Sequence, residues 1–210
     1  MHGDALLLAT RSAGKLRELH QLFASFGFEL IDLDVAGLPP EPAEDNLETF
    51  ATFEENALAK ARYFFERGRR PTVADDSGLA VDALGGAPGV LSKRWSGRAD
   101  LTGQALDDEN NRKLVHALAG VPRPSARYVC AAAYMDERRE IVRRGEVHGT
   151  IVTSPRGSGG FGYDPYFASD ELAGRTFGEV SREEKERVSH RARAVRALVA
   201  AIVDARSSRR

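Results

Sequence analysis

Apolar and polar positions predict a strand, a helix and a second strand at the start of the chain. Residues 5–9 are a continuous apolar run, which is typical of a strand buried on both faces. Apolar side chains then recur at three- and four-residue steps and predict one helix face: Leu16, Leu19, Leu22, Phe23 and Phe26. Gly27 is a suitable stop for this helix, and residues 28–32 resemble a second strand.

A second helix is predicted over residues 48–67, after a proline-rich and acidic loop at 35–47. Its apolar face is formed by Phe50, Phe53, Ala57, Ala61 and Phe64. Glu48 stands at its start, where the helix dipole favours a carboxylate and from where it could also reach a metal. Asn56 and Lys60 are one turn apart and therefore share a face, which could look into a cleft.

The pattern continues to the end of the chain. A helix is predicted over 102–119 with Leu106, Leu114 and Leu118 inward, and a hairpin over 126–135 and 140–152. The last helix begins at a capping box, residues 181–184. It carries four apolar side chains on its buried face: Val195, Leu198, Val199 and Ile202.

The composition is ordinary for a globular protein. The chain has 210 residues, of which 42% are hydrophobic and 29% charged. This length fits one large domain or two small ones. The 30 basic and 31 acidic residues nearly cancel, so no global field recruits nucleic acid or an anionic membrane.

Several features predict a cytoplasmic protein. The single cysteine, Cys130, excludes an internal disulfide and fits a reducing compartment. It lies in an apolar run, where a core position is favoured over a nucleophile. The first residues carry no basic region of a signal peptide, and no apolar run approaches the roughly 20 residues that a membrane span needs.

The stretch 73–82 holds two adjacent carboxylates, Asp75 and Asp76, followed by Ser77-Gly78. Because side chains alternate along a strand, the two carboxylates cannot share one environment. One could accept from backbone N–H groups of the scaffold while the other projects at the strand's end, as a ligand for a hard cation that accompanies a phosphate. The alternative is a simple turn, since Asp, Ser and Gly are turn residues.

Three other stretches carry candidate chemistry. Residues 10–15 (Thr-Arg-Ser-Ala-Gly-Lys) join a strand to a helix N-terminus, which suits an anion or forms an ordinary turn with a solvated lysine. The spacing is not that of a P-loop. Residues 154–165 hold four glycines in six residues, with Phe161 and Tyr163 as stacking surfaces and Asp164 as an acceptor.

The third stretch is basic. Lys185, His190 and Arg191 lie near the start of the last helical segment. They form either a solvated helical face or a set of donors, in which Lys185 meets phosphate while His190 and Arg191 donate to oxygens on a base.

Five segments together resemble the inosine triphosphate pyrophosphatase family, the house-cleaning nucleoside triphosphate pyrophosphatases. They keep the family's order and spacing from about residue 5 to 202. The segments are 8–18, 52–57, 74–79 with 85–90, 159–165, and 183–185 with 189–191.

The resemblance implies a fold and an activity. The fold would be mixed α/β, an elongated and twisted mixed sheet with flanking helices, in two lobes around a substrate cleft. A single domain would span 1–205, followed by a disordered basic tail at 206–210. The enzyme would be a homodimer that, with Mg²⁺, hydrolyses deaminated purine nucleoside triphosphates (ITP, dITP, XTP) to the monophosphate and pyrophosphate.

The resemblance also implies site residues. Asp76 would be the catalytic proton acceptor and, with Glu48, would place the metal. Residues that match the family's substrate-binding positions are Thr10, Arg11, Ser12, Ala13, Gly14, Lys15, Ser77, Phe161, Gly162, Tyr163, Asp164, Lys185, His190 and Arg191.

Two departures from the family's pattern stand out. Ser12 stands where the family usually has Asn. The Ser hydroxyl can still donate and accept a hydrogen bond, but the side chain is shorter and lacks the amide. Leu47-Glu48 stands where two acids are common, which leaves Glu48 as the metal candidate, with Glu44 and Glu54 as substitutes.

The expected chemistry is physically consistent, and two alternative functions compete with it. Mg²⁺, Lys15 and Lys185 would stabilise charge on the leaving pyrophosphate. A 6-oxo purine would be preferred over adenine because His190 and Arg191 donate hydrogen bonds. The rivals are a regulator that senses a nucleotide without hydrolysing it, which has little use for the Asp75-Asp76 pair, and a pyrophosphatase for a pyrimidine or modified base.

Overall fold

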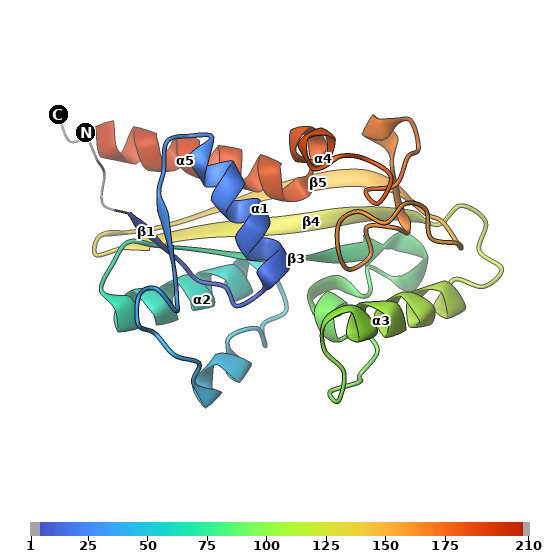
Figure 1. Cartoon of the computed structure of the whole chain (residues 1–210), viewed down its shortest axis with the longest axis horizontal. Coiled ribbons are helices and arrows are strands. Elements are labelled where there is room, and N and C mark those ends of the chain that lie inside the picture. Colours follow the sequence, from blue (N-terminus) through green and yellow to red (C-terminus); the bar gives the residue numbers. More distant parts are fainter. Residues whose placement is uncertain (1–4, 208–210) are drawn as a thin grey trace. The chain divides into compact units, whose positions relative to one another are not determined.

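The computed structural model describes residues 5–207, which form a mixed α/β protein with a six-stranded sheet and flanking helices (Figure 1). The strand order is β2-β1-β3-β4-β5-β6. The β1 strand pairs in parallel with β2 and β3, and β5 pairs antiparallel with β6. The strands are β1 (Leu6–Leu8), β2 (Leu30–Asp32), β3 (Thr72–Val81), β4 (Ser125–Asp136), β5 (Arg139–Ile151) and β6 (Phe167–Ser169). The α-helices are α1 (Ala13–Ala24), α2 (Phe53–Gly68), α3 (Gly103–Ala117), α4 (Arg182–Val188) and α5 (His190–Ser207).

The chain divides into two compact units. Unit 1 contains the chain up to Asp76, Cys130–Gly145 and the chain from Arg191 onward; unit 2 contains Ser77–Val129 and Glu146–His190. Strands β3, β4 and β5 therefore contribute residues to both units. No single cut in the chain separates the units, and the predicted single domain over 1–205 stays a prediction. Of the predicted tail, Arg206 and Ser207 end α5, and 208–210 lie outside the described residues.

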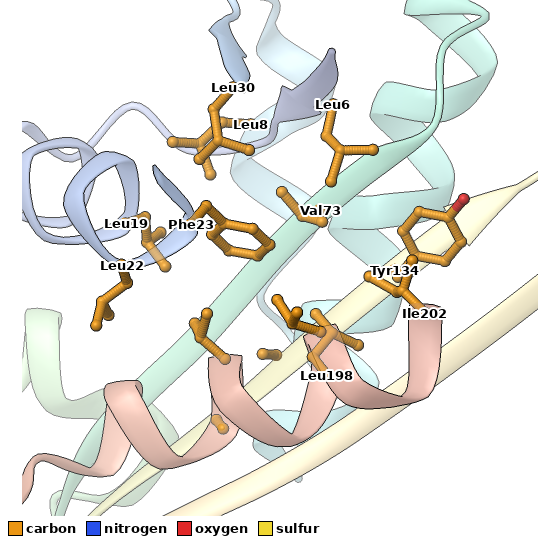
Figure 2. Packing of buried hydrophobic residues seen from close by; sticks show 14 of the residues in the cluster. Leu6, Leu8, Leu19, Leu22, Phe23, Leu30, Val73, Tyr134, Leu198 and Ile202 are labelled. Atoms are coloured by element: carbon orange, nitrogen blue, oxygen red, sulfur yellow. The ribbon is translucent and has the colours of Figure 1, made fainter. Parts of the chain in front are cut away.

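The core of unit 1 is formed by α1 and α5 packing on one face of its strands. Figure 2 shows Leu19, Leu22 and Phe23 of α1 beside Leu6, Leu8 and Val73 of the strands, with Leu198 and Ile202 of α5 completing the cluster. Because alternate strand residues face opposite ways, Leu7 points to the other face, where α2 lies (Figure 1). The predicted buried face of the last helix is confirmed, since all four of its apolar residues are buried.

The core of unit 2 is richer in aromatic side chains. Tyr128 of β4 contacts Phe167 and Phe177 at ring-centroid distances of 4.8 and 5.8 Å. Leu114 and Leu118, at the end of α3 and just beyond it, belong to the same cluster. Their burial agrees with the prediction for this helix, whereas Leu106 is only partly buried.

The alternative of a turn after Asp76 is wrong, and so is the expected strand end at Asp76. The β3 strand continues through Ser77-Gly78 to Val81, so neither Asp75 nor Asp76 stands at a strand end. Side-chain alternation continues through both carboxylates, as the extended backbone requires. The prediction that they occupy different environments is confirmed, because the Asp76 carboxylate accepts from Asn56 and the Asp75 carboxylate accepts from Arg191.

The predicted start of the second helix is also wrong. Thr52 is the N-cap of α2 and its side chain accepts from the Glu55 N–H, so the helix begins at Phe53. Glu48 and Phe50 precede the helix, and Phe50 is exposed rather than buried. Phe26 is exposed for a similar reason, because α1 ends at Ala24.

The last helical segment contains a break that the pattern did not predict. The capping box at Ser181 and Glu184 is confirmed. Ser189 then adopts an extended backbone (φ −65°, ψ 150°) and ends α4, and α5 begins at His190. Within residues 5–207 we find no helix that is both long and apolar enough to cross a bilayer.

Candidate active site

Asp75 is the centre of a buried charged cluster in unit 1. Its side chain is fully buried, and Oδ2 accepts from Arg191 Nε at 3.1 Å while Oδ1 lies 3.2 Å from Lys15 Nζ. Its main-chain oxygen accepts from Lys60 Nζ at 2.5 Å. Burial by itself would raise the pKa of Asp75, but Lys15, Arg191 and Lys60 hold the pKa well below its ordinary value. Asp75 therefore holds cationic side chains of unit 1, whereas the sequence predicted backbone N–H groups as the partners of one of the two carboxylates.

Arg191 belongs to the same cluster. Its guanidinium is 2% exposed and also forms an ion pair with Glu18 of α1. Removing one charge from this set leaves its buried partners only partly compensated. We therefore assign Arg191 a structural contact to Asp75 and Glu18, and its predicted contact with a base stays a prediction.

The Asp76 side chain lies on the opposite face of β3 from that of Asp75, in a different environment. Its Oδ2 accepts from Asn56 Nδ2 at 2.9 Å, and Asn56 is itself fixed by the Phe50 N–H, which donates to Asn56 Oδ1. Burial raises the pKa of Asp76; Lys60 and Lys15 oppose this shift, while the nearby Glu48 carboxylate adds to it. A carboxylate with a raised pKa is a better proton acceptor than an ordinary one.

Lys60 connects the two carboxylate environments. Its ammonium forms an ion pair with Glu48 and donates to the Asp75 main-chain oxygen. Sequence reasoning placed Lys60 and Asn56 on one helix face but gave neither a role. The signal was present, because these two polar side chains lie at i, i+4 on the side of the helix that also carries its buried apolar residues.

The loop at residues 10–15 forms the start of α1. The Ser12 hydroxyl caps the helix by accepting from the Lys15 N–H, and Thr10 Oγ1 accepts from the Ser12 N–H at 3.2 Å. Burial lowers the pKa of Lys15, but the charges of Asp75 and Asp76 outweigh this and raise it. Lys15 is thus a permanent cation beside a helix N-terminus that also includes Ala13 and Gly14.

Arg11 points away from this helix start. Its guanidinium donates to Glu44 through Nε at 3.0 Å and Nη2 at 2.8 Å, and it also reaches Asp34 and the Leu38 carbonyl. These contacts do not support the predicted role of the Arg11 side chain in holding a triphosphate. Glu44 is paired with Arg11, and Glu54 is paired with Arg144. These ion pairs make both acids less suitable as substitute metal ligands.

The glycine-rich stretch of unit 2 forms a tight turn. Asp164 Oδ2 accepts from the Phe161 N–H at 2.9 Å and from Lys185 Nζ at 2.7 Å. A Cβ at Gly160 would lie 2.0 Å from this carboxylate oxygen, so only glycine fits there. Lys185 also lies 5.1 Å from the centre of the half-buried Phe161 ring. The predicted residues Phe161, Asp164 and Lys185 therefore lie together.

Two aromatic side chains of unit 2 differ in what they can contact. Tyr163 is 4% exposed, and its hydroxyl donates to the Ser92 carbonyl at 2.8 Å, so its ring does not offer a stacking surface. The His190 ring is stacked on Tyr128 at 4.6 Å between centroids. Ser77 is half-buried in β3 at the start of unit 2.

Asp76 and Glu48 are the two carboxylates of unit 1 that the sequence predicted as metal ligands. Within the described residues no three His, Cys, Asp or Glu side chains gather as a metal site. Two carboxylates near each other suit Mg²⁺, which retains waters and uses substrate phosphates as further ligands. Glu48 also forms an ion pair with the Lys60 ammonium, which a metal ion at this place would have to share or displace.

Known proteins are similar to this chain over nearly its full length. The sequence is 48% identical over 202 residues to the dITP/XTP pyrophosphatase of Mycolicibacterium paratuberculosis, covering 94% of this chain and 95% of the relative. It is 45% identical to the dITP/XTP pyrophosphatase of Frankia alni, covering 92% and 94%.

Solved structures agree with the observed fold. A HAM1 protein from Coxiella burnetii superimposes with a TM-score of 0.80 at 34% identity, covering 95% of this chain and 98% of the other. A nucleoside-triphosphatase, dITP/XTP pyrophosphatase, from Mycobacterium abscessus gives a TM-score of 0.70 at 43% identity, covering 92% and 98%. Residues 6–201 match the Ham1 family, which confirms the resemblance drawn from the sequence motifs. This chain therefore belongs to the Ham1 family.

Proposed function

We propose that this enzyme hydrolyses deaminated purine nucleoside triphosphates, ITP, dITP and XTP, to the monophosphate and pyrophosphate. The observation that carries the proposal is Asp76, a buried carboxylate with a raised pKa, held by Asn56 and surrounded by Lys15 and Lys60. The activity named for the relatives from Mycolicibacterium paratuberculosis and Frankia alni supports it. Hydrolysis would remove these nucleotides from the pool before polymerases use them.

In the proposed reaction Asp76 accepts the proton of the attacking water at a carboxylate oxygen. Asn56 orients the carboxylate by donating to Asp76 Oδ2, which lowers the entropic cost of reaching the reactive geometry. Lys15 and the first N–H groups of α1 bind the polyphosphate and stabilise the charge that develops on the leaving pyrophosphate.

We propose Mg²⁺ as the cofactor, held by Asp76 and Glu48. When bound, it withdraws charge from phosphate oxygens and favours ionisation of nearby water. Burial is the main cause of the raised pKa of Asp76, and the Glu48 carboxylate adds to it; a bound cation would offset both effects, which supports a cation site.

Unit 2 supplies the groups proposed to read the base. Phe161 offers a flat surface, Lys185 lies over its ring, and His190 can donate to an oxygen such as the 6-oxo group of hypoxanthine. An adenine amino group would leave that donor without an acceptor, at a cost of about 1–3 kcal/mol.

A product assay tests the proposal. The purified chain is incubated with Mg²⁺ and with ITP, XTP, dITP, GTP, ATP or dUTP in turn, and pyrophosphate and orthophosphate are quantified separately. We expect pyrophosphate from the first three and little from ATP. IDP as the main ITP product, or binding of ITP without turnover, would overturn the proposal, and the second result would support a nucleotide sensor. Chelation by EDTA is expected to stop the reaction, and added Mg²⁺ to restore it.

We also propose that the enzyme acts as a homodimer in the cytoplasm, as its family resemblance implies. Light scattering at micromolar concentration tests the assembly. A mass of 22.9 kDa, that of one chain, would contradict the dimer.

A further inference from the structure

Gly162 of unit 2 is held by two side chains of α3 that none of the motifs includes. Its N–H donates to Asp107 Oδ2 at 2.9 Å, and its carbonyl accepts from Asn111 Nδ2 at 2.9 Å. Asp107 and Asn111 are four residues apart, so one face of α3 presents both groups. Gly162 has φ +62°, a left-handed conformation that side-chain-bearing residues disfavour.

These bonds fix the backbone on both sides of Phe161. The Phe161 N–H is held by Asp164, and the next N–H, that of Gly162, by Asp107. Because each peptide unit is planar, fixing consecutive units leaves little freedom to the φ and ψ angles between them. Asp107 and Asp164 therefore set the direction in which the Phe161 side chain leaves the backbone, while Asn111 fixes the peptide that follows.

Asn111 is an unfavourable residue for stability alone. It is 4% exposed, and within residues 5–207 its buried Oδ1 has no hydrogen-bond partner. A buried acceptor without a partner destabilises the folded state, whereas an apolar side chain of similar size would not. The contact that Asn111 does make is the one to Gly162, which points to the turn at residues 160–164 as the reason for an amide at this position.

We propose that Asp107 and Asn111 are positioning residues for base recognition: they hold the turn so that the Phe161 ring forms a fixed surface for the purine. This inference rests on the proposed function, in which Phe161 contacts the base. The group recognised is the base of a purine nucleoside triphosphate. Binding of its phosphates should not depend on Asp107 or Asn111. Asp107 and Asn111 act through Phe161 and do not themselves touch substrate.

Steady-state kinetics of Asp107→Ala and Asn111→Leu test the proposal. We expect KM for ITP to rise about tenfold in each, the size of one lost hydrogen bond, with kcat within about twofold of wild type. Inhibition by inorganic tripolyphosphate, which has no base, should stay within about twofold. Asp107→Asn keeps an acceptor oxygen and should restore most of the affinity.

Asp108→Ala is the matched control. Asp108 is exposed on the same helix and accepts from Gln104 at 2.8 Å, so its loss removes an equal charge without touching the turn. Its KM should equal that of wild type. Thermal unfolding separates positioning from scaffolding. Asn111→Leu removes both the orphan acceptor and the donor to the Gly162 carbonyl, two opposing effects, so we expect a melting temperature close to that of wild type.

The outcomes are distinguishable. Unchanged KM for ITP in both variants overturns the inference, as does an equal weakening of ITP and tripolyphosphate. A lowered melting temperature with unchanged KM assigns both residues to the scaffold and also overturns it. Wild type that fails to hydrolyse ITP overturns the proposed function instead. In that case ITP dissociation constants from calorimetry replace KM, and wild type that does not bind ITP overturns both.

Discussion

The two units differ in how they bury charge. Unit 1 holds a network in which Asp75, Asp76, Lys60 and Arg191 are each at most 7% exposed. In unit 2 the buried pair Lys185–Asp164 has aromatic rings beside it: Phe161 and Phe177 lie 5.1 and 5.5 Å from the ammonium. A charged network suits a polyphosphate and its metal, whereas flat rings with one cation suit a base.

The buried charges of the two units also stabilise different parts of the structure. In unit 1 the charges hold main elements together, since Glu18 of α1, Asp75 of β3 and Arg191 of α5 form one chain of ion pairs. In unit 2 the pair holds a local turn, because Asp164 also accepts from the Phe161 N–H. Mutations in unit 1 should therefore affect folding and chemistry, and those in unit 2 chiefly affinity.

The largest effect is expected for Asp75→Asn. It leaves Arg191 and Lys15 partly uncompensated in a buried site, which costs about 3–5 kcal/mol when one partner of such a pair is removed. The melting temperature should fall by roughly 6–20 °C, as calorimetry can measure. A change of less than about 2 °C, well below that range, would contradict the scaffold role of Asp75.

Asp76→Asn should separate chemistry from folding within the same strand. We expect turnover of ITP to fall at least about a hundredfold, the range for losing a general base or a metal-holding carboxylate. The fold should survive because Asn is nearly isosteric and the buried, ionised carboxylate of Asp76 is already disfavoured by burial. Pyrophosphate release and melting temperature measure the two effects, and equal turnover in variant and wild type removes Asp76 from the mechanism.

Lys185→Met tests the role of unit 2 in affinity. Loss of a hydrogen bond to the buried Asp164 carboxylate, about 1.5–3 kcal/mol, should raise KM for ITP between about tenfold and a hundredfold. Lys113→Met is the control, because Lys113 also lies over an aromatic ring, Trp95, at 4.3 Å, but is exposed. If both variants raise KM equally, Lys185 has no special part in binding.

The smallest effect is expected for Glu44→Gln, which depends on pH. Partial burial raises the pKa of Glu44, but the hydrogen bonds and charge of Arg11 hold it below its ordinary value. The carboxylate therefore stabilises the fold above the unfolded pKa, about 4.3, and this contribution is lost as pH falls through the lower folded pKa. The variant should be about 1–2 kcal/mol less stable at pH 7 and match wild type in acid.

Denaturant titrations at several pH values measure this difference. Asp45→Asn, an exposed acid in the same short 3₁₀ segment, should show no such dependence. A Glu44→Gln deficit that stays constant from pH 7 to acid would argue for lost packing in place of lost charge.

The sequence alone determined the elements with strong local signals. The apolar run at 5–9, the helix faces around Leu19 and Leu198 and the capping box at Ser181 each depend on residues close in the chain, so pattern and structure agree. Strand alternation likewise separated Asp75 from Asp76 before any partner was known. The motifs identified the family for the same reason, since order and spacing are properties of the chain.

Tertiary structure decided which charges meet. Arg191 and Asp75 are 116 residues apart, Arg11 and Glu44 are 33, and neither pairing has a local signature. It also carried β3 through Ser77-Gly78, because ladder pairing and burial outweighed the turn preference of those residues. The contacts of Asp107 and Asn111 with Gly162 were invisible for the same physical reason: local propensity has no term for a partner that folding brings near from some 50 residues away.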